Sequence, residues 1–561
     1  MHAPRGVLLP WIMSMILMAV AGVAQAGGGF HDVIQFGAVA NDGLDDRVAI
    51  QAAVDAACVD VAAGTPDVTV VFPAGVYDVE KGPEPAPSLP WVIVELPCGG
   101  FTLAGAPNGD TPGGLSTIRV ADNQGEYESV FGSPTFAQSV DGLRFVDLTL
   151  DGNGANNRIT TGDAAFDDVL RNRRYGIRVY AGSDIHVERS RFTDWHTVNV
   201  IVLNGVDVAN VTVTDSRFDT IGDASPIGPD WDHSSIYTDS DGAILTDNVF
   251  TSVGVGAFGV RTAIETHGPN QIVRGNRIEA FTTGMNATGV SVLGSDLQIV
   301  EDNDFLDVAD GIRIWAFEVP GNPPGEPVLR DLAIRRNTIT LNVDGWRITQ
   351  DPFEQSPRGI ELIGDSDGVI ENLVIDDNTI GFINFGAQPR DYDRWSAGIR
   401  LVPDIVTDLP IRGLTIQGNT ITNALATAIV IGSPLPNGAL LQNNRILDAG
   451  AGQPSIPDGL RSGILFFGDY RNVEIRENCV LATTTPTIAQ AIYLFGDSGT
   501  GNRILRSDVE NQSGSSIDYV RIEDPLGLPW QIDPPRDRCT TLLFRDGFES
   551  TDTSAWSATI D

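Results

Sequence analysis

The sequence predicts an all-β solenoid in which short strands stack as three-strand coils along one rod. The segment from Arg261 to Phe281 holds three short runs of alternating apolar and polar residues separated by turns. Alternation of this kind is typical of strands with one buried face. Such runs cannot bury a core alone, but stacked copies can, and similar copies recur along the chain. The intervals between copies are too long for two-strand coils, so we expect three strands in each.

An asparagine followed two residues later by an apolar residue marks the second half of each copy. Ser190 and Ser216 hold the same position in earlier copies. Asparagine tolerates left-handed backbone and bonds to its own turn, so we expect a stacked amide ladder here rather than ligand binding. The asparagines are Asn248, Asn276, Asn303, Asn337, Asn378, Asn419, Asn444, Asn478 and Asn502.

The first half of each copy reads Gly-Ile-x-apolar, as in Gly311-Ile312-Arg313. The isoleucine should point into the rod and the next residue outward. The outward position then gives one column of Arg178, Asn199, Tyr237, Glu265, Ser291, Arg313, Glu361 and Arg400. Two residues further on, a second outward column reads Tyr180, Ile201, Asp239, His267, Leu293, Trp315 and Ile363.

The charge balance excludes some partners. The 561 residues carry 36 Lys+Arg against 74 Asp+Glu, a net charge of −38. Such a chain repels nucleic acid and anionic membrane surfaces. Acidic turns that keep an elongated surface soluble explain most of this charge. We expect a monomer.

Residues 1–26 resemble a secretory signal sequence. Arg5 supplies the charge, Val7 to Val23 the apolar stretch, and Ala24-Gln25-Ala26 the cleavage site. A retained membrane anchor is the alternative. No later stretch is long and apolar enough to span a bilayer, so we expect a secreted or cell-surface protein exported by a bacterium.

Export would allow the four cysteines to form disulfides. Cys58 and Cys98 lie near the N-terminal end, and Cys479 and Cys539 near the C-terminal end. Pairing within each end would fasten both ends of a rod, whereas the other two pairings would join its opposite ends. No Cys/His spacing suggests zinc.

The N-terminal part of residues 27–535, the expected rod, differs from the repeats. Within residues 27–80 we expect a strand at Asp32 to Phe36, and a helix from an N-cap at Asp45 to about Cys58. A strand at Val68 to Phe72 then leads through a turn into another strand. Residues 536–561 form a separate acidic and aromatic tail.

This opening resembles the pectate lyase superfamily, and within it the rhamnogalacturonase/epimerase-like branch. The resemblance lies in Phe36-Gly37-Ala38, Asn41-Asp42-Gly43, Asp45-Asp46, Ile50-Gln51-Ala52-Ala53 and Phe72-Pro73-Ala74-Gly75-Val76-Tyr77. It implies a right-handed parallel β-helix whose first end is covered by the short helix. A cap is physically required, because the end coil of a solenoid exposes strand edges and an apolar cross-section.

Long interruptions of the repeat should wall one side of the rod and form a groove. They carry aromatic residues and arginines, which suit stacking on sugars, although loops also use aromatics to pack themselves. The interruptions are Asn153 to Tyr175, Gly222 to Ser234, Glu318 to Pro327, Asn342 to Arg358 and Asn384 to Ala397.

Titratable side chains concentrate at one point of the two columns. Since neighbouring parallel strands lie roughly 4.8 Å apart, Tyr237, Asp239, Glu265, His267 and Arg313 should fall within three strand steps. His196 and His233 lie near the same coils. The candidate catalytic residues are Tyr237, Asp239, Glu265, His267 and Arg313. The candidate substrate-binding residues are Arg178, Trp231, His233, Trp315, Glu361 and Arg400.

One chemistry that fits is proton abstraction from a uronic-acid polysaccharide, ending in β-elimination or epimerisation. Arg313 or His267 would neutralise the sugar carboxylate, His267 and Tyr237 would act as base and acid, and Glu265 would tune His267. Glu265-Thr266-His267 resembles the Asp-Pro-His motif of alginate epimerases, with Glu in place of Asp and without the Pro.

Two alternatives stay open. Paired carboxylates such as Asp239 and Glu265 would suit glycoside hydrolysis, although the motif set of the polygalacturonases is not found in order. A non-catalytic adhesin or surface scaffold would need no groove chemistry. No cofactor is certain, but acidic pairs such as Asp302 and Asp304 suit Ca²⁺, or are simply solvated turns.

Overall fold

The computed structural model describes residues 29–86, 89–109, 111–125, 127–157, 174–195, 199–221, 234–252, 262–281, 283–289, 295–316, 327–343, 356–364, 368–384, 396–403, 409–450, 460–483, 488–496, 499–511, 517–523, 530–535 and 539. The expected signal sequence and nearly all of the expected C-terminal tail lie outside these ranges. So do most of the long interruptions of the repeat, including Trp231 and His233, and His196.

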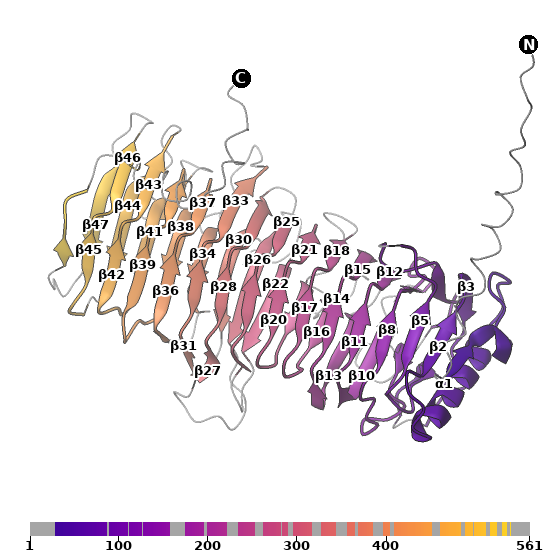
Figure 1. Ribbon diagram of the computed structural model, residues 1–561. Helices are drawn as coiled ribbons and strands as arrows, with labels where there is room; N and C mark the ends of the chain where they lie inside the picture. The colour runs from indigo at the N-terminus through magenta and orange to yellow at the C-terminus, as the bar shows by residue number, and fades with distance from the viewer. Residues whose placement is uncertain are drawn as a thin grey trace, which may run out of the picture.

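The described strands form three long parallel sheets that run the length of a rod (Figure 1). A 16-stranded sheet extends from β1 (Phe30–Asp32) to β48 (Gln531–Ile532), and a 14-stranded sheet extends from β3 (Gly75–Val79) to β46 (Asp508–Asn511). A second 14-stranded sheet and a short four-stranded one complete the described set. Along the repeats the chain visits the three long sheets in turn, which confirms the right-handed parallel β-helix with three-strand coils.

The second 14-stranded sheet carries the candidate residues, and we call it the site sheet. Its spatial order follows the chain, so each coil stacks on the one before it. The strands are β4 (Val92–Glu95), β7 (Ser129–Gly132), β10 (Tyr175–Ser183), β13 (Asn199–Ala209), β16 (Ser234–Thr238), β19 (Thr262–Thr266), β22 (Thr283–Gly289), β26 (Asp310–Ala316), β30 (Arg358–Gly364), β34 (Ala397–Leu401), β38 (Thr427–Ile431), β41 (Ser462–Phe467), β44 (Gln490–Phe495) and β47 (Asp518–Glu523).

The core is a continuous stack of the inward residues. The isoleucines of the Gly-Ile repeat, such as Ile312 and Ile360, pair in register and are fully buried, as expected. Phe192, Phe218 and Phe250 stack with ring centroids 4.9 and 4.7 Å apart and planes 9° apart. Burial of identical side chains at each step holds the strands in register.

The predicted asparagine ladder is present from Asn248 to Asn478. In each step, the backbone N–H and Nδ2 of one asparagine donate to Oδ1 of the next at 2.8–3.1 Å. The assignment of Asn502 is wrong. Its Oδ1 accepts from the Val473 N–H, and the pairing of Cys479 with Asp508 puts Ser507 at the ladder position instead.

The N-terminal cap differs in detail from the expectation. The helix α1 spans Arg47–Ala62 and begins after Asp46, one residue later than predicted, although the Asp45 carboxylate does accept from the Arg47 N–H. The expected strand at Asp32 to Phe36 is wrong, because residues 33–36 form a 3₁₀ helix after β1. No helix among the described residues combines the length and apolar character that a membrane crossing requires.

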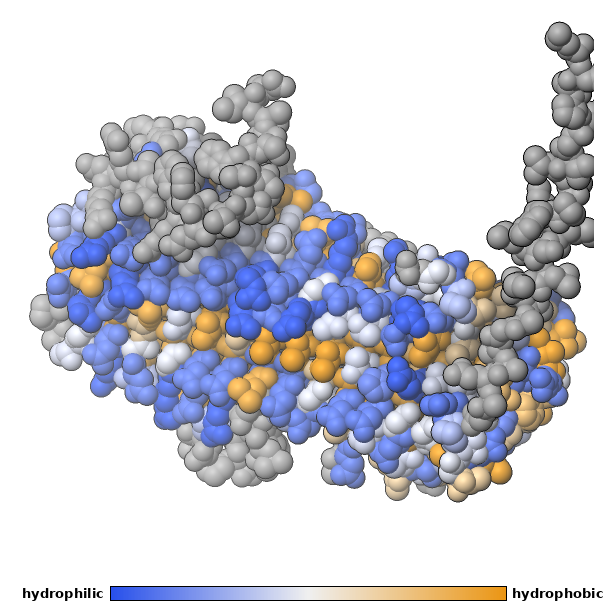
Figure 2. Space-filling view, in the orientation of Figure 1, coloured by the Kyte–Doolittle hydropathy of each residue, from blue (hydrophilic) through white to orange (hydrophobic). Residues whose placement is uncertain are grey.

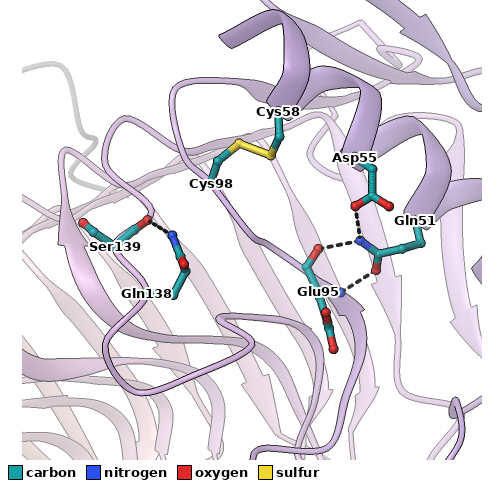
Figure 3. Close-up of a disulfide and its surroundings, with 7 residues drawn as sticks. All are labelled: Gln51, Asp55, Cys58, Glu95, Cys98, Gln138 and Ser139. Atoms are coloured by element: carbon teal, nitrogen blue, oxygen red, sulfur yellow. Dashed lines mark hydrogen bonds between the residues drawn. A yellow bond between two sulfur atoms is a disulfide. The ribbon is translucent and has the colours of Figure 1, made fainter. Parts of the chain in front are cut away.

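The cap protects the open edge of the site sheet. The Gln51 side chain donates to the Glu95 carbonyl at 3.1 Å and accepts from the Glu95 N–H at 2.7 Å, as a neighbouring strand would (Figure 3). The Cys58–Cys98 disulfide joins α1 to the segment after β4 in the same place. The other disulfide joins Cys479 to Cys539, so both predicted pairings are confirmed.

The 16-stranded sheet presents a partly apolar outer face. Figure 2 shows a hydrophobic band between hydrophilic ones along the rod. In-register outward positions of this sheet are filled by Ile244, Ile272, Ile299, Ala333 and Val374. The titratable cluster predicted from the sequence lies on the site sheet instead.

Candidate functional site

The residues that follow the inward isoleucines form one outward column on the site sheet. From β10 to β34 the pairing gives Arg178, Val202, Tyr237, Glu265, Asn286, Arg313, Glu361 and Arg400. One predicted member is wrong, because Asn199 pairs with Ser234 at the start of the strand and Val202 takes its place in the column. Ser291 lies outside the described residues, and the column residue of β22 is Asn286.

The second predicted column is only partly regular. Asp239 and His267 lie directly after the ends of β16 and β19, while Trp315 lies within β26 and pairs with Ile363. Ile201 is wrong, because it pairs with the inward Ile177 and is fully buried. Leu293 lies outside the described residues.

Tyr237, Glu265 and His267 meet at one point of the site sheet, which we call the central cluster. The His267 Nε2 lies 2.8 Å from Glu265 Oε1, and the Ser234 hydroxyl donates to Glu265 Oε2 at 2.5 Å. The Tyr237 and His267 rings lie with centroids 4.7 Å apart. The His267 N–H donates to the Thr238 carbonyl at 2.8 Å, which fixes the backbone beyond the strand end.

This geometry sets the chemistry of His267. Glu265 is only 2% exposed, and a buried carboxylate requires partners such as the Ser234 hydroxyl and the imidazole. Because an ionised carboxylate only accepts, the histidine nitrogen that faces it carries the proton. Glu265 is thus placed to stabilise the imidazolium form of His267.

Asp239 adjoins the central cluster. Its Oδ1 accepts from the Gly205 N–H at 3.0 Å. Burial raises the pKa of the Asp239 carboxyl, against the opposing effects of the Gly205 N–H and the positive charges of His267 and Arg178. A carboxyl whose neutral form is favoured this way can donate a hydrogen bond or a proton.

Arg178 lies at the N-terminal side of the central cluster. Its guanidinium carbon lies 4.0 Å from the centre of the Tyr180 ring, and its Nε lies 3.9 Å from a carboxylate oxygen of Glu128. Arg178 and Tyr237 belong to the same outward column, separated by Val202. Positive charge thus lies two strand steps from Tyr237 and three from the strand that His267 follows.

Arg313, Glu361 and Arg400 lie in a buried ionic network at the other side. Glu361 Oε1 bonds to Arg358 and to Arg400 Nη1, the latter at 2.9 Å, and Arg313 bonds to Asp310 at 2.5 Å. Burial alone would raise the pKa of Glu361, but the surrounding arginines outweigh it and lower the pKa. Burial raises the pKa of Asp310 despite Arg313. The network joins β26, β30 and β34.

Three residues that bond to the candidate residues were not predicted from the sequence: Ser234, Asp310 and Arg358. All three occupy one position, three residues before the outward column residue of their strand. Ser234, Thr262, Thr283, Asp310 and Arg358 pair in register there. The signal was therefore available in the sequence as a third column, just before the Gly-Ile unit.

The turn acids suggested for Ca²⁺ have arginine partners. The Asp302 carboxylate accepts from Arg336 at 2.8 and 2.9 Å, and Asp304 lies 3.6 Å from Arg277. Within the described ranges, no group of three or more His, Cys, Asp or Glu is arranged to hold a metal. These pairs are ordinary surface ion pairs.

Comparisons with known proteins give the class to which this fold belongs. Tailspike proteins of E. coli bacteriophage HK620 align with 87% of this chain. One variant has a TM-score of 0.59 at 15% identity over 80% of its chain, and another, in complex with a pentasaccharide, has 0.58 at 14% over 78%. At this identity the likeness concerns the fold, a parallel β-helix.

One curated protein shares a local sequence similarity. The mannuronan C5-epimerase AlgE6 of Azotobacter vinelandii is 36% identical over 126 residues, which is 22% of this chain and 13% of that protein. No family model matches the sequence.

Proposed function

We propose that this chain acts on a polysaccharide containing uronic acids, and that it removes the proton beside the sugar carboxylate. The central cluster carries this proposal: Glu265 bonds to His267 at 2.8 Å, and the Tyr237 ring lies against the His267 ring. Such a reaction needs a base for the C–H proton and an acid that completes the reaction. The local similarity to a mannuronan C5-epimerase supports this chemistry.

The contacts suggest a role for each residue. His267 takes the C–H proton, and Glu265 stabilises the imidazolium. In elimination, the electron pair of the broken C–H bond forms a C=C bond, the glycosidic C–O bond breaks, and Tyr237 gives its hydroxyl proton to the leaving oxygen. In epimerisation, Tyr237 instead returns a proton to the same carbon from the opposite face.

The sugar carboxylate also needs a partner. Asp239, whose carboxyl pKa is raised by burial, can donate a hydrogen bond to it, and Arg178 adds positive charge on the same side. Arg313 lies two strand steps from Glu265, and its guanidinium already bonds to Asp310. We therefore place the carboxylate nearer Asp239 than Arg313.

Replacing the proposed base tests this function. We expect His267→Ala to lower turnover of polymannuronate or polygalacturonate by roughly 10²- to 10⁴-fold, because the C–H proton loses its acceptor. Elimination is followed by the ultraviolet absorbance of the unsaturated product, and epimerisation by proton exchange with deuterated water.

The matched control is His186→Ala, since His186 lies on β11 (His186–Glu188) in the 16-stranded sheet. This variant should keep wild-type turnover. Equal activity of wild type and His267→Ala would refute the role of His267. An inactive wild type across a broad glycan panel would favour the scaffold alternative.

A second candidate is glycoside hydrolysis with Asp239 as general acid. The raised pKa of its buried carboxyl favours this reading, and Glu265 on the next strand would supply the second carboxylate. A tailspike with the same fold in complex with a pentasaccharide shows that the fold accommodates oligosaccharides. New reducing ends without ultraviolet-absorbing product would select this candidate.

A further inference from the structure

An exposed aromatic ring lies close to the N-terminal side of the central cluster. Phe136 belongs to the segment between β7 and β8 (Arg144–Val146), and its side chain is 48% exposed. The segment runs beside β10, because Ser139 bridges to Ala181 and the Val140 N–H donates to the Ala181 carbonyl at 3.1 Å. Its backbone is therefore anchored to the site sheet.

The Tyr180 side chain, against which the Phe136 ring packs, has contacts on several sides. The Phe136 and Tyr180 rings meet with centroids 4.6 Å apart at 74°, an edge-to-face contact. The Arg178 guanidinium lies 4.0 Å from the Tyr180 ring centre, and the Tyr180 hydroxyl bonds to Glu128, which is fully buried. Phe136 thus rests on an ordered support, so binding a ligand there would cost little side-chain entropy.

This aromatic pair is continuous with the central cluster. Arg178, which touches Tyr180, is in the outward column two strand steps from Tyr237, roughly 10 Å away. The charge of Arg178 also acts on Asp239. A sugar ring stacked at Phe136 would therefore be a different unit of the polymer from the one that contacts His267.

We propose that Phe136 and Tyr180 form a stacking subsite for a pyranose ring of the polysaccharide, beyond the sugar that reacts. The inference rests on the proposed function. A pyranose presents an apolar C–H face, and an exposed aromatic ring is its natural partner. Arg178 beside the pair favours a sugar that carries a carboxylate.

Phe136→Ala tests the subsite in the full-length protein. The probe is a series of mannuronate oligomers from disaccharide to octasaccharide, with binding measured by calorimetry. We expect roughly 3- to 10-fold weaker binding of the longer oligomers, the range that one aromatic contact supplies, and unchanged binding of the disaccharide. With polymer as substrate, KM should rise while kcat stays near the wild-type value.

Two further variants isolate the stacking. Phe136→Trp keeps a flat ring and should bind like wild type, while Phe136→Leu keeps apolar packing on Tyr180 without the ring and should behave like alanine. Phe495→Ala is the matched control, since Phe495 is 50% exposed on β44, toward the other end of the site sheet. Its binding should equal that of wild type.

The outcomes separate this inference from the proposed function. If wild type binds the longer oligomers and Phe136→Ala binds them equally well, the subsite is wrong and the proposed function stands. Equal weakening for disaccharide and octasaccharide would also overturn a distal subsite. If wild type binds no mannuronate oligomer, and no galacturonate oligomer of the same lengths, both proposals fall.

Discussion

Glu301 shows how this acidic rod stabilises a buried carboxylate. The side chain is 2% exposed and accepts from Arg274, Arg335 and Arg336, each at 2.6 Å. Burial works against ionisation, but the three arginines overcome it and lower the pKa from 4.5 to about 2. Three coils contribute to this contact, so one carboxylate links successive turns of the chain.

The pH dependence of the stabilisation by Glu301 follows from the direction in which its pKa is shifted. Because the folded pKa lies below the unfolded one, the stabilisation is fully present above about pH 4.5 and is lost as the pH falls toward about 2. We expect Glu301→Gln to lower the free energy of unfolding at neutral pH by about 1–2 kcal/mol, and the difference from wild type to shrink in that acidic window. Urea unfolding at several pH values measures both effects.

The control is Glu279→Gln, since Glu279 is half exposed and lies 3.7 Å from its arginine partner, Arg277. Exposed pairs of this kind contribute little, so its unfolding should stay within about 0.5 kcal/mol of wild type at every pH. Equal losses in the two variants would mean that the enclosure of Glu301 is unimportant.

Among single side chains, the positions that the repeat period fixes could be predicted from the sequence. Tyr237, Glu265, Arg313 and Glu361 fall in one column because each follows an inward residue at a fixed place in its copy. The column failed at β22, where Met285 occupies the inward position and breaks the Gly-Ile pattern. The contact between Glu265 and His267 depends on the path of the chain after β19, which the period does not define.

The asparagine ladder is the element that joins two sheets along the rod. Asn337 donates through Nδ2 to the Val300 carbonyl and to Asn378 Oδ1, both at 2.9 Å, and its own Oδ1 accepts from Asn303. We expect Asn337→Ala to destabilise the protein by about 2–4 kcal/mol, because buried donors and acceptors on two neighbouring coils lose their partners. Chemical denaturation measures this change.

Thr338→Ala is a suitable control, because Thr338 is exposed at the start of β29 (Thr338–Asn342), next to Asn337 in the chain. A surface change of this kind should cost no more than about 0.5 kcal/mol. If Asn337→Ala also stayed within that range, the ladder would be a consequence of stacking and not a source of stability.

The ladder could be predicted from the sequence because an asparagine recurs at one place in each copy. Asn502 was wrongly assigned to it because a similar Asn-x-Ile triplet, Asn502 to Ile504, stands at the start of β45 (Arg503–Leu505).

For the whole molecule, the architecture predicts that stability is transmitted only between neighbouring coils. The rod and its disulfides could be predicted from sequence, because only pairings within one end, such as Cys58 with Cys98, suit an elongated stack. The structure of the long interruptions could not be predicted, since they share no repeat, and the groove expected beside them stays a prediction.

In the same architecture, each disulfide should stabilise only the coils at its own end of the rod. Cys58 and Cys98 are 40 residues apart, and closing a loop of that length is worth about 4 kcal/mol in chain entropy. In a Cys58→Ser/Cys98→Ser variant, we expect faster amide hydrogen exchange in α1 and the first coils, with protection around β19 unchanged. The double variant Cys479→Ser/Cys539→Ser should show the mirror result, with faster exchange confined to the last coils. If either variant lost protection evenly along the rod, the coils would unfold as one cooperative unit, and the central cluster would depend on disulfides at distant ends.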